Sequence, residues 1–409
     1  MSNSATTWTP SSRQASNSLI LFTRAIRAFA DGYIAVLLPA FMLALGHSQW
    51  QIGLLSSVAL MGSAILTMAL GVWGYHVHSS RILGAAAILM AMTGLSFATT
   101  TVFWLLLVVA FLGTINPSAG DVSVFGPLEQ VHLADTAQGH AQVALLARYS
   151  LVGVFAGAFG ALVSALPTSI HGWTGTPEIN VMRGMFLLYS GFGVALWFLY
   201  RHPSLKGDIQ TPRPKEPLGE SRRRVLGLAA LFSLDAFGGG LVVNPLLALW
   251  LFKRFDMSLE LAGLVLFVSG VLTACSQLAA PRLAERLGLL NAMVYTHVPA
   301  NLFLIAAALA PRLELALGLL FLRSLLSHMD VPARTAFVIQ LIRPEERAAA
   351  LTLTSVTRNV AAALSPALGG LLLSKSYFVA PLALCGVLKL FYDLILWRAY
   401  RYTQINASN

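Results

Sequence analysis

The sequence predicts an all-α polytopic membrane protein in which twelve transmembrane helices form two pseudo-symmetric bundles of six. The 409 residues are 56% hydrophobic and only 11% charged, and the mean hydropathy is +0.72, as expected of a chain that buries apolar surface in lipid. Twelve apolar runs are long enough to cross a membrane, for which a helix needs about 20 residues. Residue types also recur at a constant offset of 210, as in Gln130 and Gln340 (340 − 130 = 210).

The twelve expected helices follow one another closely, except at one place. Their expected limits are 19–45, 51–73, 81–99, 102–131, 138–166, 181–200, 223–252, 259–280, 289–309, 312–341, 346–374 and 377–399. The longest hydrophilic interruption follows the sixth run, and its Pro, Lys and Arg residues are typical of a linker. The expected organisation is a cytoplasmic tail at 1–18, a six-helix bundle at 19–201, a cytoplasmic linker at 202–222, a second six-helix bundle at 223–400 and a cytoplasmic tail at 401–409.

The basic residues indicate how the helices are oriented. The formal net charge is +10, and most loop Lys and Arg residues fall on the side that holds both termini. The positive-inside rule therefore predicts cytoplasmic termini, and we expect the chain in a bacterial inner membrane. This distribution explains the basic charge without a nucleic-acid partner. Cys275 and Cys385 lie in apolar runs without Cys-x-x-Cys spacing, which predicts packed thiols rather than a disulfide or a metal site.

The repeat at an offset of 210 extends to residues that are informative in membrane helices. Gly53 falls on Gly263, Gly160 falls on Gly370, and Arg148 falls on Arg358. An arginine that falls on an arginine inside apolar runs is a stronger signal than a match of glycines in a glycine-rich chain. Two duplicated halves with a substrate between them are a common plan of secondary transporters.

Two motifs resemble the major facilitator superfamily, and the resemblance covers all twelve runs. The segment Pro281-Arg282-Leu283-Ala284-Glu285-Arg286-Leu287-Gly288 resembles the family's acidic-Arg-x-Gly loop, here between the eighth and ninth helices. It implies a conformational role for Glu285, Arg286 and Gly288, whereas the equivalent first-half loop has Tyr75 where the family has Asp. Ser365-Pro366-Ala367-Leu368-Gly369-Gly370 resembles the Gly-Pro-x-x-Gly-Gly pattern of the family's exporters.

Charged residues inside the expected helices are candidates for function, because an ionised side chain in the membrane is costly. Arg24, Arg27 and Asp31 share one face of the first helix. Asp235 lies at a similar depth in the seventh, and the resemblance implies that Asp31 and Asp235 face each other across a central cavity. Two desolvated carboxylates in one cavity are suited to proton coupling. A static Asp31–Arg27 pair and direct substrate contact are the alternatives.

Arg323 lies near the middle of the tenth expected helix and is similar to an Arg that the family places in its fourth helix. It could bind an anionic group of a substrate or act on a facing Asp, while static packing against a carbonyl is the alternative. Candidate hinges, where Pro or Gly would loosen a helix, are Asn116, Pro117, Gly239, Pro245 and Pro366.

A second set of charges lies toward the cytoplasmic side, in and beside the fourth and tenth helices. We expect these residues to form ion pairs that close the cytoplasmic side in one state and break in the other. Substrate or proton binding is the alternative role. The set consists of Asp121, Glu129, Arg148, Asp330, Arg334 and Arg358, of which Asp330 and Arg334 are an i, i+4 pair.

These observations predict a secondary active transporter that works by alternating access and exports a small organic compound in exchange for protons. The alternative within this class is uptake or exchange of an organic anion bound by the cavity arginines. A remote alternative is an intramembrane aspartyl protease using Asp121 and Asp330, although position 118 is Ser and the Gly-x-Gly-Asp pattern is incomplete. A passive channel fits the duplicated halves poorly.

We expect no enzymatic activity, cofactor or metal, and a monomer whose partners are its substrate, protons and the lipid bilayer. His76 and His78 form a His-x-His pair, but a loop position without a third ligand favours solvated side chains. The sequence also lacks a nucleotide-binding Gly-rich loop with a Lys, which argues against transport driven directly by ATP.

Overall fold

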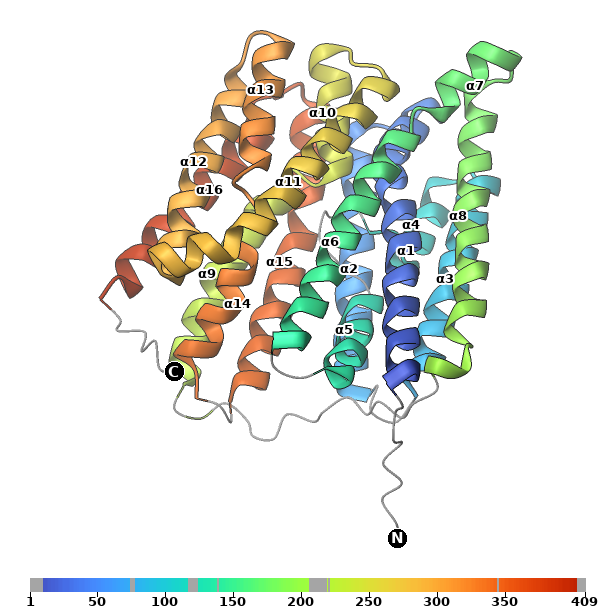
Figure 1. Cartoon of the computed structure of the whole chain (residues 1–409). Helices are drawn as coiled ribbons and strands as arrows, with labels where there is room; N and C mark the ends of the chain where they lie inside the picture. Colours follow the sequence, from blue (N-terminus) through green and yellow to red (C-terminus); the bar gives the residue numbers. More distant parts are fainter. Residues whose placement is uncertain are drawn as a thin grey trace.

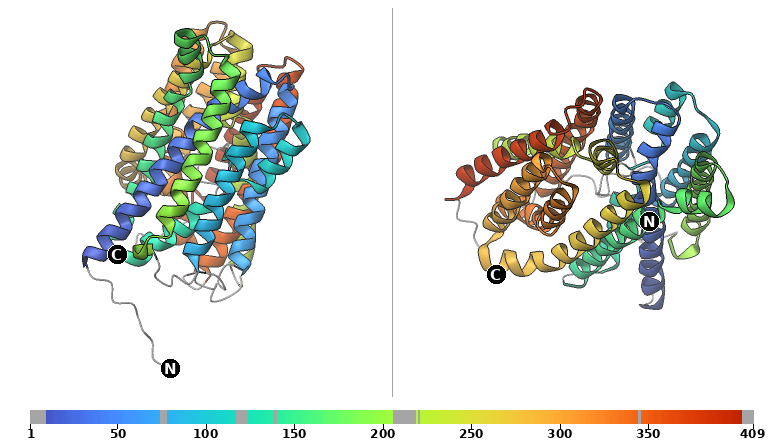
Figure 2. Two further views of the ribbon diagram at one scale, coloured as in Figure 1. Left: turned by 90° about the vertical axis from the view of Figure 1, so that its right-hand side faces the viewer. Right: turned by 90° about the horizontal axis from the view of Figure 1, so that it is seen from above.

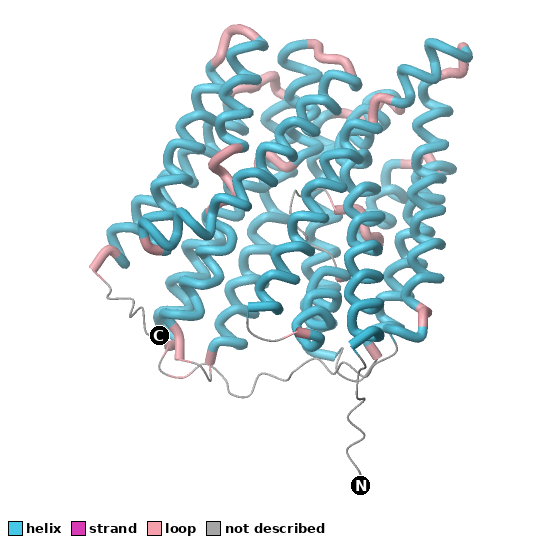
Figure 3. The backbone as a smooth tube through the Cα atoms, viewed as in Figure 1, coloured by secondary structure: helices cyan, strands magenta, loops and turns pink. Residues whose placement is uncertain are grey.

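The computed structural model describes residues 10–73, 78–116, 124–137, 140–205, 219, 221–343 and 346–402. Within these ranges the regular structure is entirely helical, and short loops join the helices (Figures 1 and 3). Seen from above, helices of the first half lie mostly on one side and helices of the second half on the other (Figure 2). The helix axes run roughly in one direction, and α1 begins at the lower end in Figure 1.

The helices follow the apolar runs closely. In chain order they are α1 (Pro10–Ala44), α2 (Gln49–Trp73), α3 (Ser79–Thr99), α4 (Phe103–Leu112), α5 (Phe125–Thr136), α6 (His140–Val163), α7 (Leu166–Thr174), α8 (Glu178–Tyr200), the 3-10 turn η2 (Pro203–Leu205), α9 (Arg222–Gly240), α10 (Asn244–Phe255), α11 (Leu259–Leu287), α12 (Leu289–Leu309), α13 (Leu313–Ser324), α14 (Asp330–Leu341), α15 (Arg347–Ser374) and α16 (Ala380–Tyr400). Ten segments of the described chain are long and apolar enough to cross a membrane. Large apolar side chains such as Trp104, Phe198 and Leu309 are exposed, which suits a lipid-facing surface.

Three expected helices are each divided in two. The seventh breaks between α9 and α10, where Gly238 to Gly240 precede Asn244-Pro245, as expected from the weak helix preference of Gly and the missing N–H of Pro. The tenth, expected to be continuous over 312–341, is α13 and α14, because Pro332 lacks the N–H that would bond to the carbonyl of His328. The fourth, expected over 102–131, is α4 and α5, and the candidate hinge Pro117 lies between them, outside the described residues.

The segment 281–288 is helical rather than a loop. α11 continues through Glu285 and Arg286 to Leu287, and both charged side chains are exposed in its last turn. Gly288 then has φ +80°, a conformation that glycine adopts without strain, so α12 begins at the next residue. A single glycine thus makes the whole connection.

The two halves of the chain meet through glycines that are related by the repeat. α2 packs against α15, and α6 packs against α11. Gly53 lies against the carbonyl oxygen of Pro366 and the backbone of Gly370, so that a Cβ on Gly53 would be 2.8 Å from the Gly370 Cα. Gly263, its repeat mate, lies in the same way against the carbonyl oxygen of Ala161, 2.6 Å from where its Cβ would be. Close backbone approach at small residues is a common way to pack helices in membranes.

These contacts lie at the upper end of the bundle in Figure 1, opposite the beginning of α1. Gly53 is in the first turns of α2, which directly follows α1, and Gly370 is close to the end of α15. A hydrogen bond crosses the same contact, from the Ala367 N–H to the Ser57 Oγ at 2.8 Å. Pro366, a candidate hinge, therefore lies inside a continuous α15 and in the contact between the halves.

At the opposite end of the second half, Glu346, directly before α15, binds the backbone directly before α9. The backbone N–H groups of Gly219 and Ser221 donate to its two carboxylate oxygens, at 3.2 and 3.1 Å. A hydrogen bond from the Ser221 side chain, together with these two, holds the pKa of Glu346 below its usual range. The beginning of α9 is thereby tied to the beginning of α15.

A Cβ at Gly53 tests the close contact between α2 and α15. We expect Gly53→Ala to destabilise the protein by about 1–3 kcal/mol, the usual cost of overpacking, despite the better helix propensity of Ala. Reversible unfolding in SDS, followed by circular dichroism, measures the difference. Gly191→Ala in α8 is the matched control, because nothing lies within 4 Å of the added Cβ. Equal stability of the two variants would contradict the packing described.

Candidate functional site

A buried carboxylate, Glu129 of α5, is the centre of a polar cluster in the first half. Arg27 of α1 forms an ion pair with it and also donates to the Tyr149 hydroxyl at 3.2 Å. Tyr149 of α6 and Tyr200 of α8 donate to the carboxylate at 2.6 and 2.5 Å, and Thr23 donates at 3.0 Å. We call these five residues the Glu129 cluster. It joins four helices through one side chain.

In the Glu129 cluster, the charges of Glu129 and Arg27 are compensated by their ion pair and by hydrogen bonds. The side chains of Glu129 and Arg27 are 0% and 2% exposed, and burial of this kind is costly unless the charges are paired and hydrogen-bonded. The Arg27 guanidinium also stacks over the Phe125 ring, with 4.4 Å from Cζ to the centroid. Every partner comes from the first half of the chain, so this cluster holds that half together.

Arg24 and Asp31 lie on the same helix, on either side of Arg27. The Arg24 guanidinium packs over the Tyr149 ring at 5.0 Å. It also lies against α6 at Gly153, where a Cβ would be 2.5 Å from its Nε. Asp31 is half-buried, and the Tyr189 hydroxyl of α8 lies 3.5 Å from its Oδ1 and 3.4 Å from the Thr114 hydroxyl.

Asp235 of α9 is the centre of a second cluster, in the other half of the chain. Lys389 of α16 donates to its Oδ1 at 2.6 Å, and Arg334 of α14 lies 3.3 Å from its Oδ2. Arg334 also forms the expected i, i+4 ion pair with Asp330, which confirms that contact. We call these four residues the Asp235 cluster. Its side chains are between 3% and 12% exposed, so it too is shielded from water.

A histidine connects the Asp235 cluster to another buried acid. His297 of α12 places its Nδ1 2.9 and 3.0 Å from the two carboxylate oxygens of Asp393 on α16. Its other ring nitrogen, Nε2, lies 3.8 Å from Asp235 Oδ1. Asn301, one turn along α12, donates to Asp393 Oδ2 at 3.2 Å. The imidazole therefore lies between two carboxylates.

His297, Lys389 and Asp393 are not among the site residues predicted from the sequence. The signal was present, because Lys389 and Asp393 are charged residues four positions apart in the last apolar run. The argument applied to the first and seventh runs applies equally to the ninth and twelfth. What the sequence could not show is that these residues converge on Asp235.

The structure brings together residues that the sequence analysis assigned to two separate sets. Arg27, expected in a mid-membrane set, contacts Glu129 of the expected gate, and Asp235 likewise contacts Arg334. The charges are reversed between the halves, because α1 supplies a cation to α5 whereas α9 supplies an anion to α14. The repeat thus preserves which helices are paired but not which of them carries the positive charge.

The remaining candidates lie in different surroundings. Arg323 is half-buried in the last turn of α13, Arg358 is half-buried in α15, and its repeat mate Arg148 is exposed on α6. Asn116 is buried directly before the segment 117–123. Asp121, Pro117, Tyr75 and His76 lie outside the described residues. Cys275 and Cys385 are both free thiols; Cys385 is buried, whereas Cys275 is exposed and is not packed as the sequence predicts.

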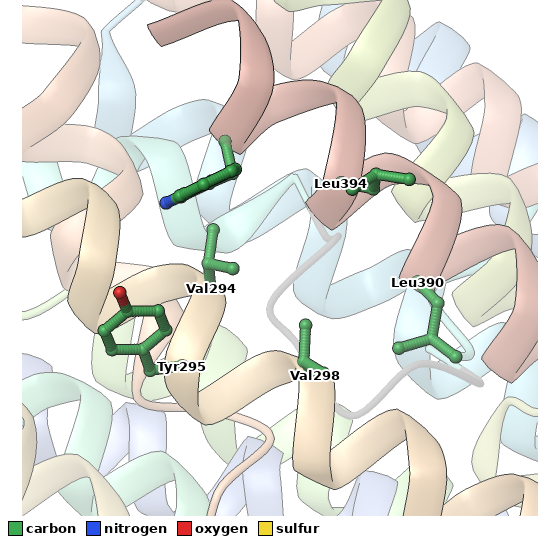
Figure 4. A pocket seen from close by; sticks show the side chains of 6 residues that line it. Val294, Tyr295, Val298, Leu390 and Leu394 are labelled. Atoms are coloured by element: carbon green, nitrogen blue, oxygen red, sulfur yellow. The ribbon is translucent and has the colours of Figure 1, made fainter. Parts of the chain in front are cut away.

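Within the described ranges, no group of three or more His, Cys, Asp or Glu side chains is arranged to hold a metal ion. A groove of about 240 Å³ lies between α12 and α16, shown in Figure 4. Its lining is apolar and consists of Val294, Tyr295, Val298, Leu390, Leu394 and Trp397. Neither His297 nor Asp393 lines this groove, so it is separate from the charged clusters.

Removal of the charge at Glu129 tests whether the first cluster stabilises the fold. Glu129→Gln leaves Arg27 as a buried cation without its anionic partner, and we expect a loss of about 3–5 kcal/mol in unfolding free energy. The double variant Arg27→Gln/Glu129→Gln should recover much of this loss. SDS unfolding followed by circular dichroism measures both. Glu260→Gln, at an exposed position of α11, is the control; a Glu129→Gln variant as stable as this control would contradict the prediction.

Comparisons with known proteins show the family to which the chain belongs. A family model described as the Major Facilitator Superfamily matches residues 20–322 and 236–408. An uncharacterized membrane protein of Saccharomyces cerevisiae is 24% identical over 410 residues, which cover 91% of this chain and 91% of that protein.

Solved structures share the fold at low sequence identity. A D-xylose–proton symporter matches with a TM-score of 0.72 at 15% identity, over 93% of this chain and 97% of that one. A bacterial homologue of the iron transporter ferroportin, in an inward-facing state, matches with a TM-score of 0.69 at 14% identity, over 94% of this chain and 98% of that one. Because the family model matches most of its length, the chain belongs to the major facilitator superfamily and is a multi-pass membrane transporter rather than an enzyme.

Proposed function

We propose that the chain is a secondary active transporter that exports a small organic compound in exchange for protons by alternating access. The observation that carries this proposal is the pair of buried charged clusters, one in each half, built on helices that are broken near the charges. Buried ionised groups are costly in a membrane and are typical of substrate and proton pathways. Broken helices around such groups are typical of transporters.

The proposed architecture has twelve crossings. The ten long apolar segments supply ten of them, and the divided helices α4–α5 and α13–α14 supply the other two. The crossings form two six-helix bundles, at 19–201 and 223–400, joined by the linker 202–222. The excess of Lys and Arg at the end where α1 begins favours a cytoplasmic location for both termini, in a bacterial inner membrane. A monomer suffices for this plan, because both halves are in one chain.

We infer that this structure is an inward-facing state. The backbone contacts at Gly53 and Gly263 join the halves at the end opposite the beginning of α1, which is the outer end in the proposed orientation. The segment 365–370, which resembles that of exporters, lies in one of these contacts. Glycine contacts contain no charge that must be desolvated or exposed when the halves separate there, so they suit a surface that opens and closes.

The charged residues have two proposed roles. Asp31 is the candidate for proton exchange, because it is a half-buried carboxylate of α1 that lies 3.5 Å from the Tyr189 hydroxyl. Arg24, Arg27 and Asp235 complete the proposed cavity set. Glu129, Asp330 and Arg334, with Asp121, Arg148 and Arg358, remain the proposed cytoplasmic gate, which in the outward-facing state would form pairs between the halves in place of the pairs within each half seen here. Glu285, Arg286 and Gly288 remain the proposed conformational segment.

Arg24 and Arg323 favour an alternative class of substrate, the organic anions. Arg24 lies beside Tyr149, and Arg323 is half-buried at the break between α13 and α14, where a broken helix could admit an anionic group. In this alternative the chain takes up or exchanges an organic anion. The substrate would then compensate the arginine charge, and Asp31 would have a structural role.

A respiration-generated pH gradient in everted vesicles tests the proposed function. Cationic, neutral and anionic compounds are added in turn, and we expect a subset to collapse the gradient, because each exported molecule returns protons. Asp31→Asn should abolish this response while protein levels and compound binding, measured by thermal shift, remain. Absence of a response to every compound, in wild-type protein that still binds one of them, would contradict proton-coupled export.

The effect of Arg323→Ala distinguishes the two substrate classes. Under the leading proposal, transport of cationic dyes continues in this variant but is lost in Asp31→Asn. Under the anion alternative, Arg323→Ala reduces the initial rate of uptake of anionic compounds by about tenfold or more. This is the expected loss when a charge-assisted contact is removed. Initial rates of dye and anion flux in the same vesicles measure both outcomes.

A further inference from the structure

We propose that His297 carries the coupling proton in the second half of the chain, held between Asp393 and Asp235. This inference rests on the proposed function, and it adds a proton-carrying group and its route. The inference rests on the position of the imidazole between the two carboxylates. His297 is 4% exposed, its Nδ1 is within 3.0 Å of both Asp393 oxygens, and its Nε2 is 3.8 Å from Asp235.

The two ring nitrogens have different partners, and this difference defines the step. In the neutral ring, the Nδ1–H donates to Asp393 and the Nε2 lone pair is directed toward Asp235. A proton that binds at Nε2 forms a new N–H bond that faces Asp235, whose Oδ1 lies 3.8 Å away. Release of the Nδ1 proton to Asp393 restores a neutral ring of the other tautomer. One proton thus enters at one nitrogen and leaves from the other, and Asp393 becomes a neutral carboxylic acid that must release this proton before the next cycle.

Asp393 is prepared for this exchange by Asn301. The amide Nδ2 of Asn301 donates to Asp393 Oδ2 at 3.2 Å and fixes the carboxylate against the ring. Asp393 itself is 1% exposed. The Tyr392 ring lies edge-on to the imidazole, at 6.1 Å between centroids, and covers its face. The imidazole is therefore oriented by its neighbours, as proton-transferring histidines are.

The charges around His297 balance when its ring is neutral. Asp235, Asp330 and Asp393 supply three negative charges, and Lys389, Arg334 and Arg358 supply three positive charges. His328, in the turn after α13, also lies within electrostatic range of His297, and Arg323 at the end of α13 lies within range of His328. The charged residues of α11, which also packs against α12, are exposed at its ends: Glu260, Arg282, Glu285 and Arg286.

A proton on His297 changes the contacts of Asp235. The added positive charge, and the new donor at Nε2, compete with Lys389 and Arg334 for the two oxygens of that carboxylate. Those cations belong to α16 and α14, so weaker pairing loosens both helices from α9. A proton can thereby bias the arrangement of the broken helices, which is the coupling that a proton-driven carrier needs.

Nitrogen-15 NMR of the histidine rings tests the inference without a transported compound. The wild-type protein, in lipid nanodiscs, is titrated between about pH 5 and 9, which brackets the ordinary histidine pKa of about 6.5. We expect one resonance set, absent in His297→Gln, to gain and lose a proton at Nε2 reversibly. Asp393→Asn should shift that set, whereas His171→Gln, which removes an exposed histidine, should leave it unchanged.

The vesicle assay tests the same residue in transport. For a compound that moves protons in wild-type protein, His297→Gln should reduce compound-evoked proton movement by about tenfold or more. Exchange of labelled for unlabelled compound, which needs no net proton movement, should continue. His171→Gln should retain both activities.

The outcomes separate this inference from the proposed function. If no compound moves protons in wild-type protein, the proposed function fails, and the NMR titration still decides whether His297 binds a proton. A His297 ring that stays neutral throughout the titration, or wild-type proton movement in His297→Gln, would overturn the inference. If His297→Gln does not fold, Asp393→Asn identifies the resonance by its shift and replaces it in the vesicle assay, where unchanged proton movement would also overturn it.

Discussion

The cost of holding ionised side chains away from water governs how this chain is arranged. The side chains of Glu129 and Asp235 are no more than 3% exposed, and each carboxylate forms an ion pair with at least one cation. Neither carboxylate could be buried alone, because moving an unpaired charge from water into a low-dielectric interior costs on the order of several kcal/mol. Each carboxylate therefore requires particular side chains from particular helices, and this requirement selects how the helices pack.

The two clusters meet this requirement in different ways. In the first half, Glu129 is satisfied by an arginine and three hydroxyl groups, from α1, α6 and α8. In the second half, Asp235 is satisfied by two cations, and a histidine links it to a further acid. A hydroxyl-rich cluster holds its charge fixed, whereas one with several ionisable members can redistribute a proton. The halves share a repeat but not an electrostatic role.

The described contacts between the halves at Gly53 and Gly263 contain no such charges. The backbones approach closely there, and the attraction between α2 and α15 and between α6 and α11 is that of packed small residues and of hydrogen bonds at Ser57 and between Ser150 and Gln277. Contacts of this kind separate without exposing a buried ion. Strong electrostatic constraints inside each half, combined with apolar contacts between them, suit the alternating access that we propose.

The sequence by itself determined the apolar helices, the repeat and the contacts that are local in the chain. Hydropathy located the long helices, Gly53 and Gly263 were matched by their offset, and Asp330 and Arg334 were paired by helical spacing. Each of these depends on residues a few positions apart or on a regular pattern, so composition and periodicity suffice. The break near Gly239 and Pro245 was equally readable, because Gly and Pro disfavour a helix wherever they occur.

Only the tertiary structure decided the rest. Arg27 and Glu129 are 102 positions apart, and Lys389 and Asp235 are 154 apart, so no local pattern pairs them. The extension of α11 through Glu285 also depended on how the chain packs. Charge on a helix is visible in a sequence, but which charge it meets depends on the depth and rotation of every neighbouring helix. Those are set when the whole bundle satisfies its buried ions at once.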